Sequence, residues 1–148
     1  MAVNPESAGK SFPSAATYLV GREKVREFAR AVGETSSLCL DVEAARAAGY
    51  ADVVAPTTFP IVITLELMGA VATDPSVGLD WSRVVHAEQR FKHSRPVVAG
   101  DELSAVTTIE EIKVLAGNDI VSLRGDLSDA AGELVCQVWT SLLARAEA

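Results

Sequence analysis

Two residues whose side chains could take part in acid-base chemistry lie in one short stretch of this sequence. Glu34 and Cys39 lie five residues apart in GETSSLCLD, residues 33–41. General acid-base catalysis requires a carboxylate or a similar group that exchanges a proton with the substrate. The reference pKa of a cysteine thiol is about 8.5. No Lys, Arg or His lies close to Cys39 in the sequence to lower that pKa. We therefore expect Cys39 to pack as a small apolar residue, and Glu34 to be a solvated carboxylate unless it acts as the acid-base group.

Two histidines, His86 and His93, are the only imidazoles of the chain. Either could act as a general base, because histidine titrates near neutral pH. Both fall in an alternating segment that predicts a strand, and we expect them on the face opposite the core-facing set. That set comprises Val85, Ala87, Gln89 and Phe91. The pattern therefore favours a surface or interface role for both histidines, whereas Gln89 is expected to line a binding tunnel.

Two amphipathic helices flank the stretch that contains Glu34. Residues 21–32 place apolar side chains at i, i+3, i+4 and i+7, and Gly33 ends this helix. Asp41 is expected to cap a second helix over residues 42–48, which is followed by glycine. The two helices should therefore hold the stretch between them in place.

A third predicted helix, over residues 57–73, is apolar on every side apart from one glutamate and a few threonines. A helix that is hydrophobic all round belongs inside a protein. Thr57 or Thr58 is expected to cap it. We therefore expect Leu65 and Met68 to be almost fully buried.

The second half of the chain has the period-two pattern of an antiparallel sheet with short turns. Strands are predicted over residues 83–93, 103–114, 120–128 and 134–144, with one more near 17–20. This order fits an α+β hot-dog fold, in which an antiparallel sheet wraps around one long helix. The length predicts a single domain over residues 1–148, with a short flexible end at about 1–10. Exposed apolar flanks of such a domain predict a dimer.

Composition excludes several classes of protein. A formal charge of -7 argues against a nucleic-acid partner, because that requires clustered Lys and Arg. The two cysteines fit a reducing cytoplasm with free thiols, and their spacing predicts no metal site and no zinc. No other feature predicts a cofactor. The apolar run 59–72 is shorter than a membrane span, which takes about 20 residues, and residues 1–10 do not resemble a signal peptide. We therefore expect a cytoplasmic protein.

The stretch that contains Glu34 resembles the active site of MaoC-like (3R)-hydroxyacyl-thioester hydratases and dehydratases. Their pattern is Gly-Asp-x-Asn-Pro-x-His-x-Asp, then a short helix ending in Gly, then Ala-His-Gly before a long helix. Four residues of the pattern match in register: Gly33, Asp41, Gly49 and Ala55. The family's catalytic Asp falls on Glu34, its catalytic His on Cys39, and its second His on Pro56.

Further segments resemble small actinobacterial subunits described as MaoC-like N-terminal or FAS1-like dehydratase domains. These segments are GREKVREFA (residues 21–29), APTTF (55–59) and RPVVAGD (95–101). In the heterodimeric dehydratases of that group, this kind of chain is the acyl-binding partner, and a second hot-dog chain carries the Asp and the His. The loss of both catalytic identities agrees with that division of labour.

The resemblance also implies roles for individual residues. Glu34 and Cys39 occupy the catalytic positions, both substituted. The N–H groups at the start of the long helix polarise the thioester carbonyl in the family, a device that depends on backbone geometry. The resemblance implies a substrate-binding site formed by Pro56, Thr57, Thr58 and Gln89.

Three hypotheses follow for the function. The first is a dehydratase component that binds an acyl-CoA or acyl-carrier-protein thioester, in fatty-acid or polyketide-type metabolism, and completes a site on its partner. The second is a self-sufficient homodimeric hydratase or thioesterase that uses Glu34. The third is a binding module for acyl thioesters without turnover. Co-purification with a chain that has the intact motif separates the first from the others, and hydration and thiol-release assays separate the second from the third.

Overall fold

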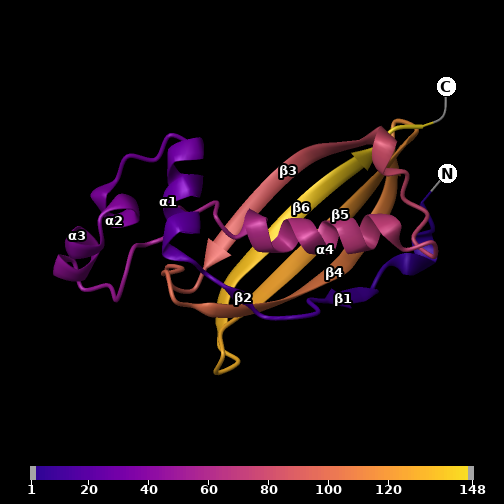
Figure 1. The fold of residues 1–148 in the computed structure, drawn as a ribbon. Helices are drawn as coiled ribbons and strands as arrows, with labels where there is room; N and C mark the ends of the chain where they lie inside the picture. The colour runs from indigo at the N-terminus through magenta and orange to yellow at the C-terminus, as the bar shows by residue number, and fades with distance from the viewer. Residues whose placement is uncertain (1–2, 147–148) are drawn as a thin grey trace.

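The computed structural model describes residues 3–146 and places one long helix across a curved antiparallel sheet (Figure 1). The elements follow in the order η1 (Pro5–Ser7), β1 (Ser11–Pro13), β2 (Tyr18–Leu19), α1 (Arg22–Ala31), α2 (Ser37–Leu40), α3 (Val42–Ala47), α4 (Ile61–Thr73), η2 (Trp81–Arg83), β3 (Val84–His93), β4 (Glu102–Leu115), β5 (Asn118–Ser128) and β6 (Leu134–Ala144). The sheet order is β1-β4-β5-β6-β3, with β2 paired to β4. This is the predicted α+β hot-dog arrangement.

The four predicted strands of the second half are confirmed to within two residues at each end. Their ladders are all antiparallel, since short turns join neighbouring strands. The predicted strand near residues 17–20 is β2. The sequence pattern missed β1, because three residues that include a proline at the sheet edge give too short a pattern to recognise.

The N-terminal segment, predicted as a flexible end, contacts the rest of the chain from Val3 onward. Val3 is only 1% exposed, and its N–H donates to a carboxylate oxygen of Asp119 at 3.1 Å. Asn4 caps η1 and donates its backbone N–H to the Val77 carbonyl. Burial of one valine against the far end of the sheet therefore holds residues 3–10 in place, a contact that no local pattern encodes. The first two residues of the predicted flexible end lie outside the described residues.

Helix α4 is buried on its sheet-facing side, not all round. Met68 is 1% exposed, as predicted, whereas Leu65 is 54% exposed, so the prediction for Leu65 was wrong. The neighbouring Glu66 is exposed as well. One sheet covers one side of a helix, and the outer side of α4 has no cover among residues 3–146. The apolar outer face carries Leu65 beside a carboxylate that stays in solvent.

The start of α4 also differs from the prediction. The helix begins at Ile61, and Pro60 occupies the capping position without a side-chain hydrogen bond. The expected cap by Thr57 or Thr58 was therefore wrong. Residues 57–60 instead form a turn, in which the Thr58 carbonyl accepts from the Ile61 N–H at 3.2 Å. A proline that lacks an N–H fits this position, because the first helical donors have no partner within the helix.

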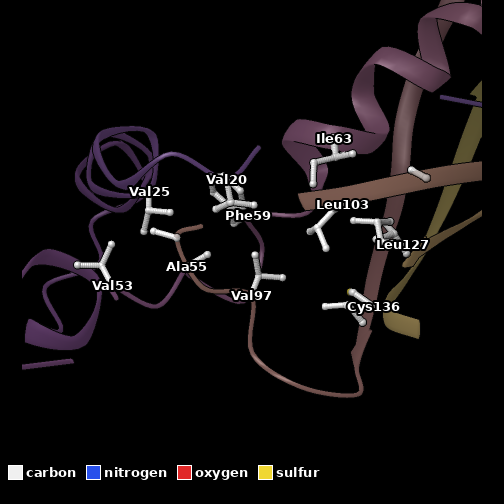
Figure 2. Close-up of a cluster of buried hydrophobic side chains, with 14 of the residues drawn as sticks. Val20, Val25, Val53, Ala55, Phe59, Ile63, Val97, Leu103, Leu127 and Cys136 are labelled. Carbon is white, nitrogen blue, oxygen red and sulfur yellow. The ribbon is translucent and has the colours of Figure 1, made fainter. Parts of the chain in front are cut away.

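Two apolar clusters fill the space between α4 and the sheet. One joins α1, the segments that precede α4 and follow β3, and the first turns of α4; it is centred on Phe59, which is fully buried (Figure 2). The other contains Met68 and Val71 from the C-terminal half of the helix. Between them, α4 approaches the sheet closely at Gly125, where an added Cβ would lie 2.9 Å from Cγ2 of Thr64. A residue without a side chain permits this approach.

Candidate active site

The stretch between α1 and α3 is held at both ends by the predicted caps. Gly33 follows α1 with a positive φ of 74°, a conformation that glycine adopts at little cost. At the other end, Oδ1 of Asp41 accepts from the N–H of Glu43 at 2.9 Å and more weakly from that of Ala44 at 3.4 Å. The predicted N-cap is confirmed, so the backbone between these points has a defined path.

Glu34 and Cys39 lie on this path. Oε1 of Glu34 accepts a hydrogen bond from the Ser36 N–H at 2.8 Å. Cys39 is 6% exposed, and burial, followed by the charge of Glu34, raises the pKa of its thiol. A raised pKa keeps the sulfur protonated near neutral pH, which makes a thiolate base unfavourable. The burial of Cys39 favours the packing role expected from the sequence.

The segment before α4, around Ala55, pairs with the segment after β3, around Val97. The Ala55 N–H donates to the Val97 carbonyl at 2.8 Å, and the Ala99 N–H donates to the Val53 carbonyl at 3.0 Å. An isolated antiparallel bridge joins the same two segments. Pro56, which follows Ala55, is buried. The segment after β3 therefore positions the turn that leads into α4.

Arg95, Asp101 and Asp129 form an ion-pair network at the segment after β3. The guanidinium of Arg95 donates to both carboxylate oxygens of Asp101, at 2.8 and 3.1 Å, and to Asp129 at 3.4 Å. Asp101 also accepts from the Val98 N–H at 2.9 Å. Hydrogen bonding to Asp101 is the main cause that raises the pKa of Arg95. This geometry explains the Arg-Pro-Val-Val-Ala-Gly-Asp run: its first and last residues clamp the backbone between them.

The turn before α4 presents two backbone donors. Thr57 and Thr58 are both exposed, and neither of their N–H groups donates to an acceptor within residues 3–146. Phe59 anchors the turn, and its ring meets that of Phe28 edge-on at 5.4 Å. His93 fixes the other side, with Nε2 2.8 Å from the Thr57 carbonyl oxygen. The amides therefore lie at the positive end of the helix α4 dipole.

A cavity of about 670 Å³ opens beside this turn. Its walls come from α1, the start of α4, and the edge strand β3. The lining residues are Phe28, Val32, Thr58, Ile61, His86, Ala87, Glu88, Gln89 and Phe91. Thr58 and Gln89, both predicted as site residues, meet at this cavity, whereas Pro56, Thr57, Glu34 and Cys39 are not among its lining residues. Its mixture of aromatic and aliphatic walls with a few polar groups is typical of a small-molecule site.

The histidines were misplaced by the sequence pattern. A register shift between His86 and Glu88 interrupts the pairing of β3 with β6, and a bulge of this kind exchanges the two faces of a strand. Gln89, Phe91 and His93 share one partly buried face because they alternate along the strand after the shift, and the shift brings His86 onto the face of Gln89. The prediction that both imidazoles lie opposite Gln89 was wrong. Alternation alone places His93 with Gln89, whereas the position of His86 depends on the shift, which the alternation rule does not include.

His86 and Gln89, two of the polar residues that line the cavity, contact one another. Nε2 of His86 lies 2.7 Å from Oε1 of Gln89, and the hydroxyl of Thr140 donates to the same oxygen at 3.1 Å. Thr140 is 4% exposed, so the amide of Gln89 is fixed from behind by β6. The sequence pattern favoured a surface or interface role for His86, and the structure places it at the cavity.

Other features of the molecule offer less chemistry. A cavity of about 500 Å³ is lined by residues of β3 to β6, including Arg90, which stacks over the Trp139 ring at 4.7 Å. Within residues 3–146, no group of three or more His, Cys, Asp or Glu side chains is placed to hold a metal ion. No helix in that same part of the chain is long and apolar enough to cross a membrane.

A sheet wrapped around α4, with the paired segments before α4 and after β3, defines a hot-dog protein of the MaoC-like dehydratase class. One chain of the C-terminally truncated HadBC (3R-hydroxyacyl-ACP dehydratase) complex from Mycobacterium tuberculosis matches 97% of this chain and 100% of its own length, with a TM-score of 0.87 and 33% identity. A MaoC-like dehydratase of known structure gives a TM-score of 0.88 and 35% identity, over 95% of this chain and 42% of that chain.

Residues 6–138 match the FAS1-like dehydratase domain region, and the chain belongs to this family. The UPF0336 protein of Streptomyces griseus subsp. griseus is 54% identical over 146 residues, which are 99% of this chain and 97% of the relative. The UPF0336 protein of Clavibacter michiganensis subsp. michiganensis is 52% identical over 147 residues, 99% of each chain. The ChsH1-ChsH2 complex of Mycobacterium tuberculosis, at 12% identity and a TM-score of 0.71, shares the fold.

Proposed function

We propose that this chain is the acyl-binding component of a (3R)-hydroxyacyl-thioester dehydratase. In this proposal it binds the acyl chain of a coenzyme A or carrier-protein thioester, in fatty-acid or polyketide-type metabolism, and a second hot-dog chain supplies the acid and the base. The observation that carries the proposal is an apolar cavity lined in part by Thr58, whose N–H has no acceptor within the described residues, while the position of the family's base holds a buried thiol, Cys39.

Carbonyl polarisation needs only backbone. An N–H group at a helix start stabilises the negative charge that develops on a thioester oxygen, whatever side chain the residue carries. The amides of Thr57 and Thr58 have no acceptor within the described residues. The replacement of the family's Ala-His-Gly by Ala55, Pro56 and Thr57 therefore removes a side chain but keeps these donors.

Proton transfer, unlike polarisation of the carbonyl, requires side chains that exchange protons. Removal of water from a 3-hydroxyacyl thioester requires a base for the proton on the carbon next to the carbonyl and an acid for the departing hydroxyl. Burial raises the pKa of the Cys39 thiol, and neither Cys39 nor Glu34 lines the cavity. A catalytic group must reach hydrogen-bond distance of the proton that it moves, so a partner chain is the better source of both groups.

The surface beside the cavity has features that favour association with a second hot-dog chain. Strand β3 ends the sheet order, so one of its edges is unpaired within the described sheet, and an unpaired edge is a template for another chain. Three of the exposed apolar side chains are Val32 directly after α1, Leu65 on α4 and Val85 on β3, at 53%, 54% and 40% exposure. The similarity to a chain of the HadBC complex agrees with such an assembly.

The test measures hydration of crotonyl-CoA by the purified chain and by the chain mixed with a hot-dog protein that co-purifies with it and has the intact Asp-x-Asn-Pro-x-His motif. We expect slow or absent hydration by the chain alone and turnover by the mixture. An ordinary turnover number for the isolated chain, on the order of 1–10³ per second, would favour the homodimeric hydratase instead. Absence of turnover in every mixture, with acyl binding retained, would favour the binding module.

A matched pair of variants tests the cavity itself. Val32→Asp places a charge in the cavity wall, whereas Val114→Asp changes a valine of similar exposure, 60% against 53%, that does not line the cavity. Burial of an unpaired carboxylate against an acyl chain is unfavourable. The first variant should lose affinity for acyl-CoA by at least tenfold, about 1.4 kcal/mol, and the second should retain it. Equal effects of the two variants would place the acyl group elsewhere.

A further inference from the structure

Gln89 has its carbonyl oxygen fully engaged at the cavity wall. An amide oxygen has two lone pairs, and Oε1 receives one hydrogen bond from Thr140 at 3.1 Å and one from Nε2 of His86 at 2.7 Å. The Nε2 atom of Gln89 is buried without a partner within the described residues. The reversed amide would donate to the same two groups, to the Thr140 hydroxyl and to Nε2 of His86 in its Nδ1–H tautomer, and would leave Oε1 in the unpaired place; in the orientation that the structure has, the oxygen accepts from both groups. The side chain is therefore held by its oxygen.

This arrangement selects one tautomer of His86. Because Oε1 of Gln89 only accepts, Nε2 of His86 must carry the hydrogen. In the neutral imidazole the other nitrogen, Nδ1, is then an acceptor. No residue among 3–146 donates to Nδ1, and the ring is exposed at the cavity. The cavity thus presents a hydrogen-bond acceptor next to the apolar walls formed by Phe28 and Phe91.

We propose that His86 is a substrate-binding residue whose Nδ1 accepts a hydrogen bond from the 3-hydroxyl of a hydroxyacyl thioester, with Gln89 and Thr140 positioning its ring. The proposal rests on the proposed function, since it needs an acyl thioester in this cavity. A 3-hydroxyacyl chain offers a hydroxyl donor to this nitrogen, and a saturated chain of the same length offers none. His86 therefore confers selectivity for the hydroxylated substrate.

The charged neighbour at the wall is consistent with this role. Glu88, the other ionisable residue that lines the cavity, is exposed, and its carboxylate is also an acceptor at neutral pH. Neither side chain offers a donor that would favour a saturated or unsaturated acyl chain over a hydroxylated one. His86 is distinguished from Glu88 by its fixed orientation, because Gln89 holds the ring.

The experiment compares the binding of (3R)-hydroxyhexanoyl-CoA and hexanoyl-CoA to the full chain by calorimetry. The wild type should prefer the hydroxylated ligand by about 2- to 10-fold, the range of a single hydrogen bond. His86→Leu should remove this preference and leave the affinity for hexanoyl-CoA within about twofold. His86→Asn, which keeps a donor and an acceptor, should retain part of it. Lys92→Leu, on the same strand but not lining the cavity, is the control.

A spectroscopic readout separates positioning from packing. With ¹⁵N-labelled histidine, the wild-type His86 ring should show the Nε2–H tautomer, and Gln89→Leu should shift it toward a mixture. A dominant Nδ1–H tautomer in the wild type, equal affinities for the two ligands, or a preference that survives in His86→Leu would each overturn the role of His86 while acyl binding stands. Failure of the wild type to bind either ligand would overturn the proposed function itself.

Discussion

Nε2 of His93 lies 2.8 Å from the carbonyl oxygen of Thr57 and ties the edge strand β3 to the turn that presents the free amides. Because a carbonyl only accepts, this nitrogen carries the hydrogen. His93→Leu removes the donor and should weaken acyl-thioester binding by about 2- to 10-fold, the range for one hydrogen bond. His93→Gln keeps a donor and should lose less. Calorimetric titration with hexanoyl-CoA measures both, and equal losses in the two variants would contradict a role for the hydrogen bond.

Close packing of α4 on the sheet makes Gly125 sensitive to a single methyl group. An added Cβ would lie 2.9 Å from Cγ2 of Thr64, and overpacking of this kind costs about 1–3 kcal/mol. Gly125→Ala should lower the free energy of unfolding by that amount, less up to about 1 kcal/mol gained from a stiffer unfolded chain.

Thr64→Ser supplies the control, because it removes the clashing methyl group and keeps the hydroxyl that donates to the Pro60 carbonyl at 3.4 Å. The double variant with Gly125→Ala should be more stable than Gly125→Ala alone, as measured by urea unfolding. A strictly additive loss in the double variant would show that the strain at Gly125 comes from another contact.

Two neighbouring leucines of α4 distinguish the core from the expected interface. Leu67 is 4% exposed and Leu65 is 54% exposed. Leu67→Ala should destabilise the chain by about 2–5 kcal/mol, whereas Leu65→Ala should change the stability of the isolated chain by less than about 0.5 kcal/mol. With the hot-dog partner, Leu65→Ala should weaken association. Urea unfolding and sedimentation of the mixture test the two expectations, and an unchanged assembly would remove Leu65 from the interface.

Arg22 and Asp52 connect α1 to the segment before α4 and make a pH-dependent contribution. Hydrogen bonds from Arg22, at 2.9 and 2.6 Å, are the main cause that lowers the pKa of Asp52 from its ordinary 3.8 to about 2. A carboxyl whose pKa is lower in the folded state stabilises the fold above pH 3.8, and this contribution disappears as the pH falls through about 2. Asp52→Asn should therefore lose less stability than the wild type between pH 4 and pH 2, in urea unfolding at each pH. Parallel curves would contradict the assignment.

Much of the fold was predictable because its local signals agree. Asp41 caps α3 as its position before an alanine-rich helix predicts, and the period-two strands form the expected ladders. Leu65 was misassigned, because an apolar pattern does not distinguish a side chain of the core from one on the exposed side of a helix. The position of His86 depended on a bulge in β3, which side-chain alternation cannot reveal. Thr58 and Gln89 line the same cavity, since one precedes a helix start and the other lies on a stretch of β3 whose alternation is regular beyond the bulge.

Glu34 and Cys39 occupy the two substituted positions of the family motif. Glu34 accepts from the Ser36 N–H at 2.8 Å and does not line the cavity, and Cys39 is buried with a raised pKa. Glu34→Gln and Cys39→Ala should therefore leave crotonyl-CoA hydration by the chain and its partner within a few-fold of the wild type. Circular dichroism checks that each variant is folded. A loss of several orders of magnitude in folded Glu34→Gln, recovered in Glu34→Asp, would assign the acid-base carboxylate to this chain and support a self-sufficient hydratase.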